Sequence, residues 1–239
     1  MPISYQIAGR VSAKKDLTKV GAESHFAQCI RQVFRDARPR KIIETGTYHG
    51  AGTTTVIAEA LLTSGATDDV FYTIEVNPRH HQKAVANLDR FGDRVRVLRG
   101  LSVPRRLLPS VEQIADRCVR SVEADGLFVD HEEAERARLY HGETDFPDAP
   151  DDLLGKCIAE FDGRPEFVLL DSGGHMGYLE FHYVLGLLEG PCYVALDDIY
   201  HVKHHRSFRE IQADPRFELV VASEEKFGFC IARFNPAGS

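Results

Sequence analysis

Short apolar runs alternate with helical patterns along this chain, and few folds are open to a chain built in that way. Runs with the length and β-rich composition of buried strands fall at 41–45, 70–75, 94–100, 166–171, 192–198, 217–223 and 227–234. Helical patterns cover 24–37, 52–64 and 78–91, so the early strands are joined through helices and are expected to be parallel. The last two runs are close enough to pair directly. The sequence therefore predicts an α/β fold with a doubly wound, mostly parallel seven-stranded sheet, helices on both faces and an antiparallel edge strand.

The chain is interpreted as one domain, residues 1–239, because 43% hydrophobic residues at this length can bury one large core. Residues 1–38 form an N-terminal helical extension. Residues 103–165 are interpreted as an insertion, because more chain separates the third strand from the fourth than a crossover needs. Its acidic centre, 125–152, contains a predicted short helix at "EEAERARLY". Two interpretations stay open: a lid over a substrate, or a surface elaboration that could form a homo-oligomer contact.

Composition excludes several classes of partner. The net charge is −7 and the one basic stretch, 31–41, is mixed with other residues, which disfavours nucleic-acid binding. No apolar run reaches the roughly 18 residues of a membrane span, and the N-terminus lacks the apolar core of a secretory signal. A cytoplasmic protein with no membrane partner is expected. The odd number and wide spacing of the cysteines predict reduced core residues: Cys29, Cys118, Cys157, Cys192 and Cys230.

A glycine-rich turn, "IIETGTYHGAGTT" (42–54), follows the first predicted strand. Gly46, Gly50 and Gly52 would bring backbone N–H groups and a helix N-terminus close to a ligand, which usually indicates phosphate. Glu44, beside the turn, would repel phosphate. The turn therefore favours a cationic or zwitterionic ligand group.

Acidic residues stand at the ends of several predicted strands: Glu44, Glu75, Asp171, Asp197 and Asp198. Open parallel sheets bind ligands beyond the carboxyl ends of their strands. The carboxylate of Glu75 could accept hydrogen bonds from both hydroxyls of a ribose. S-Adenosylmethionine combines a ribose, an amino acid and a sulfonium without phosphate, so it matches these requirements.

In these residues the chain resembles the class I S-adenosylmethionine-dependent methyltransferases, in particular the metal-dependent catechol and caffeoyl-CoA O-methyltransferase branch. The resemblance covers about 40–102 and 166–200, through the glycine turn, "TIEVNP" (73–78) and "RVRVLRGLS" (94–102). It implies a Rossmann-like methyltransferase fold and methyl transfer to a hydroxyl of a small molecule. It also implies that Glu75 binds the ribose, Ser102 lies by the adenine and 44–50 lines the methionine end. The implied cofactor-binding residues are Glu44, Gly46, Tyr48, Gly50, Thr53, Glu75, Ser102 and Asp171.

The same branch has an acid at the end of strand four, and an acid followed by Asp or Asn at the end of strand five. Here these are Asp171, Asp197 and Asp198, three carboxylates suited to Mg²⁺, Mn²⁺ or Ca²⁺. A bound ion would hold a substrate hydroxyl and lower its pKa. The alternative is structural: Asp198 caps the helix that begins near 203, and Asp171 caps a loop.

Histidine and lysine residues near these acids are candidates for the base. The branch often has Lys or His shortly after the strand-four acid, and His175 stands four residues after Asp171. In "HVKHH" (201–205), Lys203 or His201 could serve the same purpose or contact an anionic substrate, and His204 could also lie in the pocket. His49 is interpreted as a neighbour of the cofactor. Three other histidines are interpreted as surface or packing residues: His80, His81 and His182.

The substrate class stays open. The aromatic elements that bind catechol are not recognisable and the chain has no tryptophan, so a sugar or other polyol hydroxyl is as plausible as a phenol. Three other functions were weighed: an NAD-dependent dehydrogenase, an Fe²⁺ oxygenase on the same fold, and a non-catalytic cofactor-binding protein. The dehydrogenase is disfavoured because its glycines would run G-x-G-x-x-G, whereas this chain has G-x-x-x-G-x-G.

Overall fold

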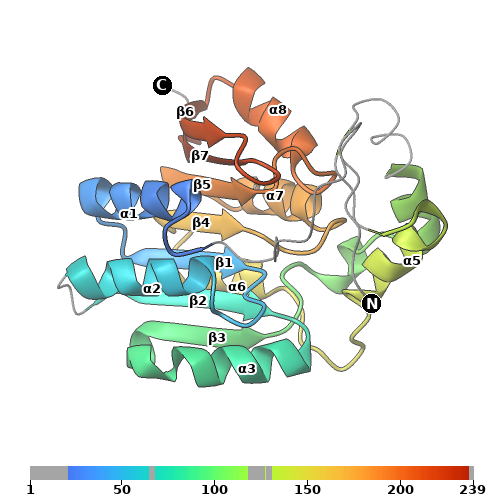
Figure 1. The fold of residues 1–239 in the computed structure, drawn as a ribbon, viewed down its shortest axis with the longest axis horizontal. Helices are drawn as coiled ribbons and strands as arrows, with labels where there is room; N and C mark the ends of the chain where they lie inside the picture. The colour runs from blue at the N-terminus through green and yellow to red at the C-terminus, as the bar shows by residue number, and fades with distance from the viewer. Residues whose placement is uncertain (1–20, 65–67, 118–126, 128–130, 237–239) are drawn as a thin grey trace.

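A seven-stranded sheet forms the centre of the molecule, in the order β3-β2-β1-β4-β5-β7-β6 (Figure 1). The structure is a computed structural model that describes residues 21–64, 68–117, 127 and 131–236. All predicted strands are present, with ends that differ from the prediction by at most two residues. The strands are β1 Lys41–Thr45, β2 Val70–Glu75, β3 Val95–Arg99, β4 Phe167–Leu170, β5 Cys192–Asp197, β6 Phe217–Ser223 and β7 Phe229–Phe234.

The direction of the strands confirms the predicted sheet. Strands β1 to β5 pair in parallel with one another, with β1 between β2 and β4. Strand β7 is antiparallel to both β5 and β6, so it lies one place inside the edge that β6 forms. The switch in strand order therefore falls between β1 and β4, where an open α/β sheet binds its ligands.

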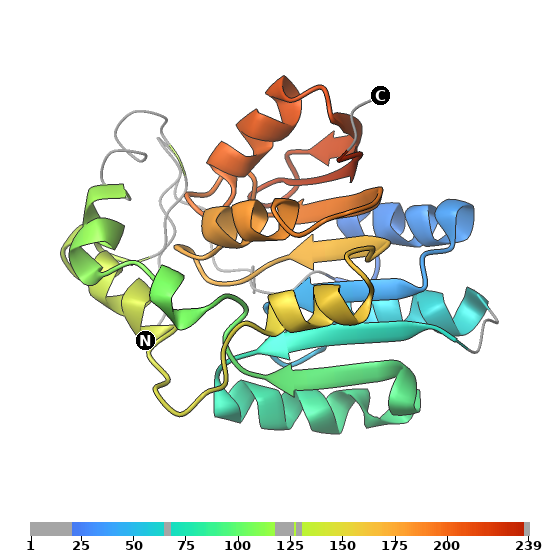
Figure 2. The ribbon, with the colours of Figure 1, turned by 180° about the vertical axis from the view of Figure 1, so that it is seen from behind.

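Helices cover both faces of the sheet, so the fold is doubly wound (Figures 1 and 2). On one face, Phe26 and Ile30 of α1 and Ile57 of α2 pack against Phe71 and Phe167 of the strands. Apolar residues of α6, α7 and α8 pack against the strands in a second hydrophobic cluster. The helices are α1 His25–Ala37, α2 Thr53–Ser64, α3 Pro78–Leu88, α5 Glu133–Gly142, α6 Leu153–Glu160, α7 Gly177–Leu185 and α8 His205–Ala213, with 3-10 turns η1 Asp89–Arg94 and η2 Arg105–Leu107.

The segment between β3 and β4 has two parts. Its last part, α6, contributes Leu154, Cys157 and Ile158 to the core and serves as the crossover helix. The earlier part includes a helical stretch at 111–117 and α5, which lies off the sheet at the carboxyl ends of the strands in both views (Figures 1 and 2). Residues 118–126 and 128–130 of the predicted lid lie outside the described residues, as do Cys118 and residues 1–20 of the predicted extension.

Two general expectations can be compared with the described residues. Cys29, Cys157, Cys192 and Cys230 are free thiols, and three of these four are buried. None of the described helices is both long enough and apolar enough to span a bilayer.

Candidate active site

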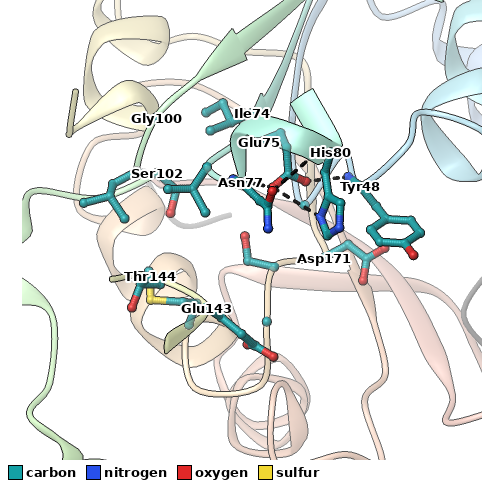
Figure 3. Close-up of a pocket in the computed structure, with 16 residues that line it drawn as sticks. Tyr48, Ile74, Glu75, Asn77, His80, Gly100, Ser102, Glu143, Thr144 and Asp171 are labelled. Carbon is teal, nitrogen blue, oxygen red and sulfur yellow. Dashed lines mark hydrogen bonds and ion pairs between the residues drawn. The ribbon is translucent and has the colours of Figure 1, made fainter. Parts of the chain in front are cut away.

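A cavity of about 310 Å³ opens at the carboxyl ends of the strands (Figure 3). The strand side of its wall includes Gly46, Glu75, Ser102 and Asp171. These four residues follow or end different strands, so the topology alone brings them to one place. A cavity of this size lies at the lower end of the range for small-molecule sites.

Glu75 ends β2 and points into this cavity. Its carboxylate accepts hydrogen bonds from the backbone N–H of Tyr48, at 2.7 Å, and of Asn77, at 2.8 Å (Figure 3). Burial raises the pKa of Glu75, while these backbone donors oppose the shift. Each carboxylate oxygen can accept a further hydrogen bond, so Glu75 can still bind two hydroxyls of a ligand.

The glycine turn brings β1 against the end of β4. Gly46 has a φ of +80°, and a Cβ added to it would lie 2.2 Å from the carbonyl oxygen of Asp171. Gly46, Tyr48, Thr53 and Asp171 line a second, smaller cavity of about 40 Å³. Gly50 has a φ of +69° and packs against Leu88 instead, outside both cavities. Its role is to turn the chain.

Glu44 lies beneath the turn and lines neither cavity. Its side chain is fully buried and accepts hydrogen bonds from the hydroxyls of Thr53, at 2.7 Å, and Thr73, at 2.6 Å. Burial raises its pKa to about 7, although the threonine hydroxyls oppose the shift. These contacts join the start of α2 to β2, and the predicted contact of Glu44 with the cofactor stays a prediction.

Three aromatic rings pack together beside the larger cavity. Tyr48 has a φ of +52° and stacks on His49, with ring centroids 3.8 Å apart, and meets His80 edge-on at 4.5 Å. His80 lines the cavity, whereas the sequence suggested a surface or packing residue. Burial, followed by the neighbouring His49 and Lys83, lowers the pKa of His80, which favours a neutral ring.

The three aspartates predicted to bind metal do converge. Asp171, Asp197 and Asp198 each offer an oxygen within 4.8 Å of the others. The ammonium of Lys203 lies among them, 2.6 Å from Asp171 Oδ1 and 2.7 Å from Asp198 Oδ2. Burial alone would lower the pKa of Lys203, but the three carboxylates raise it well above its ordinary value. Burial and the other two aspartates raise the pKa of Asp197.

The alternative role of Asp198 as a helix cap is not seen. Helix α8 begins at His205, with His204 at the N-cap position and no side-chain cap. Asp198 instead adopts a φ of +62°, and its carboxylate faces Lys203.

His175, the first candidate base, lies apart from the aspartates. The Nε2 atom of His175 lies 3.3 Å from the Thr144 hydroxyl, and burial, then His141 and Arg117, lower the pKa of His175 to about 4. His175 lines a separate small cavity with Arg117 and Arg206. Lys203 contacts the aspartate carboxylates with its side chain, whereas His201 donates its backbone N–H to the carbonyl oxygen of Asp198 at 3.1 Å.

Two further histidines shape the loop that carries Lys203. His201 Nδ1 accepts a hydrogen bond from the backbone N–H of Lys203 at 3.1 Å. His204 Nε2 lies 3.1 Å from the carbonyl oxygen of Leu170, and burial lowers the pKa of His204 well below its ordinary value. Both rings are therefore used in holding the loop after β5.

Sequence analysis missed a buried acid on α7. Glu180 is fully buried and accepts hydrogen bonds from Thr45, at 2.8 Å, and from Ser172, at 2.7 Å, and a hydrogen bond with Ser102 further stabilises its charged form. Burial raises the pKa of Glu180, and these hydroxyls oppose the shift. Glu180 therefore holds hydroxyls from three segments around the cavity. A lone acid in the apolar stretch "GYLEFHYVL" was the signal that could have identified it.

The segment between β3 and β4 also contributes to the cavity, through Glu143 and Thr144 (Figure 3). Helix α5 is anchored by Tyr140, which is fully buried. A Cβ added to Gly174 would lie 2.5 Å from the ring of Tyr140, so the glycine after β4 makes room for it. No sequence pattern indicated these contacts.

Comparisons with known proteins agree with this architecture. Models of known protein families and the curated proteins give no match to the chain. A putative caffeoyl-CoA O-methyltransferase from Staphylococcus aureus matches with a TM-score of 0.55 at 15% identity, over 93% of each chain. An O-methyltransferase from Bacillus cereus, solved with S-adenosylhomocysteine, matches with a TM-score of 0.53 at 17% identity, over 90% of this chain and 83% of that one. An O-methyltransferase from Streptomyces achromogenes, solved with S-adenosylmethionine, matches with a TM-score of 0.52 at 15% identity, over 90% of this chain and 82% of that one. These likenesses establish the methyltransferase-like fold that the sequence predicted.

Proposed function

We propose that this protein transfers a methyl group from S-adenosylmethionine to a hydroxyl of a small molecule, such as a sugar, another polyol or a phenol. One observation carries the proposal. A single cavity has a buried carboxylate suited to a ribose, Glu75, and also Asp171 of a partly buried charged cluster. The solved structures described above are O-methyltransferases of the same fold, which supports the same reaction class.

The cavity suits the nucleoside part of the proposed cofactor. Glu75 supplies oxygen acceptors for ribose hydroxyls. Ile74, Leu101 and Met176 add apolar surface, and Ser102 adds a hydroxyl, which is the mixture that an adenine ring needs. Gly46 lets the backbone of the turn come close to the methionine end.

The acceptor would bind on the side of Asp171. When bound, S-adenosylmethionine supplies a methyl group; the acceptor oxygen bonds to the methyl carbon, the C–S electron pair stays on sulfur, and the hydroxyl proton must leave. Asp171 lines both cavities, which supports it as the acceptor of that proton. Burial raises the pKa of Asp171, Lys203 opposes the shift and Asp198 adds to it. A raised pKa makes a carboxylate a better general base near neutral pH.

A divalent ion does not fit this arrangement as it stands. The oxygens of Asp171, Asp197 and Asp198 have the chemistry that Mg²⁺, Mn²⁺ or Ca²⁺ requires. The ammonium of Lys203, however, already bridges two of the three carboxylates. The predicted metal dependence stays a prediction.

The proposal is tested by cofactor binding. We expect S-adenosylhomocysteine, but not NAD, to bind in a calorimetric titration. Glu75→Ala should weaken that binding by about 1.5–3 kcal/mol, the range for hydrogen bonds to a charged group. Glu218→Ala, at an exposed position of β6, is the matched control and should bind normally. A folded Glu75→Ala protein with wild-type affinity would remove Glu75 from the site, and preferential binding of NAD would favour the dehydrogenase.

A second prediction concerns the segment that carries Glu143 and Thr144. If it acts as a lid, ligands should hold it against the cavity that both residues line. Trypsin cleavage after Arg138, which is exposed on α5, should then slow when S-adenosylhomocysteine is added. Cleavage of the exposed Arg90 site gives the internal control. Equal slowing at both sites, or none at Arg138, would favour a fixed surface elaboration.

A further inference from the structure

A lysine ammonium lies inside the acidic cluster. The Nζ atom of Lys203 is 2.6 Å from Asp171 Oδ1 and 2.7 Å from Asp198 Oδ2, distances typical of strong charge-assisted hydrogen bonds. The side chain of Lys203 is only 6% exposed, so this contact is not a surface ion pair of the kind that solvent and salt weaken.

The surrounding chain is built to hold the lysine there. A Cβ added to Gly177, the first residue of α7, would lie 2.6 Å from Lys203 Cγ and 2.7 Å from its carbonyl oxygen. The lysine stem therefore passes through space that exists only because residue 177 is a glycine. The backbone of Lys203 is fixed as well, since its N–H is bound to His201 Nδ1 at 3.1 Å.

This arrangement leaves little room for a second cation. Asp171, Asp197 and Asp198 present oxygens within 4.8 Å of one another, and the ammonium takes two of the three carboxylates as partners. An added divalent ion would have to compete for those oxygens and would lie close to a like charge in a partly buried site, where solvent screens their repulsion less than at the surface.

We infer that Lys203 is the resident cation of the cluster of Asp171, Asp197 and Asp198, and that it takes the place of a divalent ion. The consequence for catalysis rests on the proposed function: the positive charge beside the acceptor hydroxyl comes from the chain itself, and methyl transfer needs no added metal. Lys203 lines neither cavity, so its charge would act on an acceptor oxygen from behind Asp171, which lines both and which its ammonium contacts at 2.6 Å. Asp171 and Asp198 hold that ammonium in position.

The test is Mn²⁺ binding, followed by electron paramagnetic resonance on the full chain. Wild-type protein should bind Mn²⁺ at least about tenfold more weakly than Lys203→Met, in which an apolar side chain of similar length removes the competing charge. Lys156→Met, which removes an exposed lysine bound to the carbonyl of Asp151, is the matched control and should behave as wild type. In Lys203→Met, a further Asp197→Asn change should weaken Mn²⁺ binding again.

Two results would overturn the inference. One is equal Mn²⁺ affinity of wild type and Lys203→Met. The other needs no lysine variant that folds: tight Mn²⁺ binding by wild type, with a Kd of about 1 μM or lower, that Asp197→Asn abolishes would show that the lysine yields to the ion. Binding of S-adenosylhomocysteine in the presence of a chelator is measured separately. Its absence with and without Mg²⁺ would reject the proposed function and leave the Mn²⁺ result unaffected.

Discussion

Gly46→Ala is expected to lower the free energy of unfolding by more than about 4 kcal/mol, the range of the most damaging single substitutions. The new methyl group would lie 2.2 Å from the carbonyl oxygen of Asp171 and 2.5 Å from its carbonyl carbon, and Gly46 has a φ of +80°. Neither side can move away easily, because Thr45 and Leu170, the residues just before these two, are paired in the centre of the sheet. The measurement is urea unfolding followed by circular dichroism.

Gly92→Ala separates the two causes of that loss. Gly92 has a φ of +60°, but a Cβ there would meet no atom within 4 Å. With a ψ of −152°, Gly92 lies in a region that glycine alone normally adopts, so Gly92→Ala should cost only the conformational strain, about 1–3 kcal/mol. Similar losses for Gly46→Ala and Gly92→Ala would mean that the turn does not press against the end of β4.

The position of the acids could be predicted because it follows from sheet topology. Asp171 and Asp197 stand at or just after the ends of β4 and β5, which are neighbouring parallel strands, so their meeting needs only the strand assignment. Glu75 and Gly46 follow in the same way from β2 and β1. In each case a local pattern of apolar residues determines where the strand ends.

The direction of loop side chains could not be predicted in that way. Lys203 reaches the aspartates because Gly177 leaves space and His201 holds its backbone, and both conditions depend on the packed structure. His175 was predicted from its spacing after Asp171, yet its ring is turned to Thr144. Spacing along a loop does not fix the direction of a side chain.

Glu44 shows a limit of a different kind. Strand β1 is buried on both faces, so apolar alternation does not say which of its side chains faces a ligand. The sequence suggested that this acid selects a cationic ligand group. In the structure its partners are Thr53 and Thr73, which places its contribution in the support of the turn.

Glu44→Gln is expected to remove a large pH dependence of stability. The pKa of Glu44 is about 7 in the folded protein, against an ordinary value of 4.5, so between these values the folded state holds a proton that the unfolded chain releases. Wild-type stability should therefore fall as the pH rises from 4.5 to 7, by up to about 3 kcal/mol in total, since one pKa unit corresponds to about 1.4 kcal/mol. Glutamine has no such proton to lose.

The measurement is the free energy of unfolding of wild type and Glu44→Gln from pH 4.5 to pH 8. The amide must rearrange its bonds with Thr53 and Thr73, which adds a cost that does not change with pH. As the pH rises, the free energy of unfolding of wild type should therefore fall relative to that of Glu44→Gln, whichever protein is the more stable at pH 4.5. Glu218→Gln on exposed β6 should follow wild type throughout. Parallel curves for wild type and Glu44→Gln would mean that Glu44 is ionised in the folded protein, and an ionised acid beside the glycine turn would again favour a cationic ligand group there.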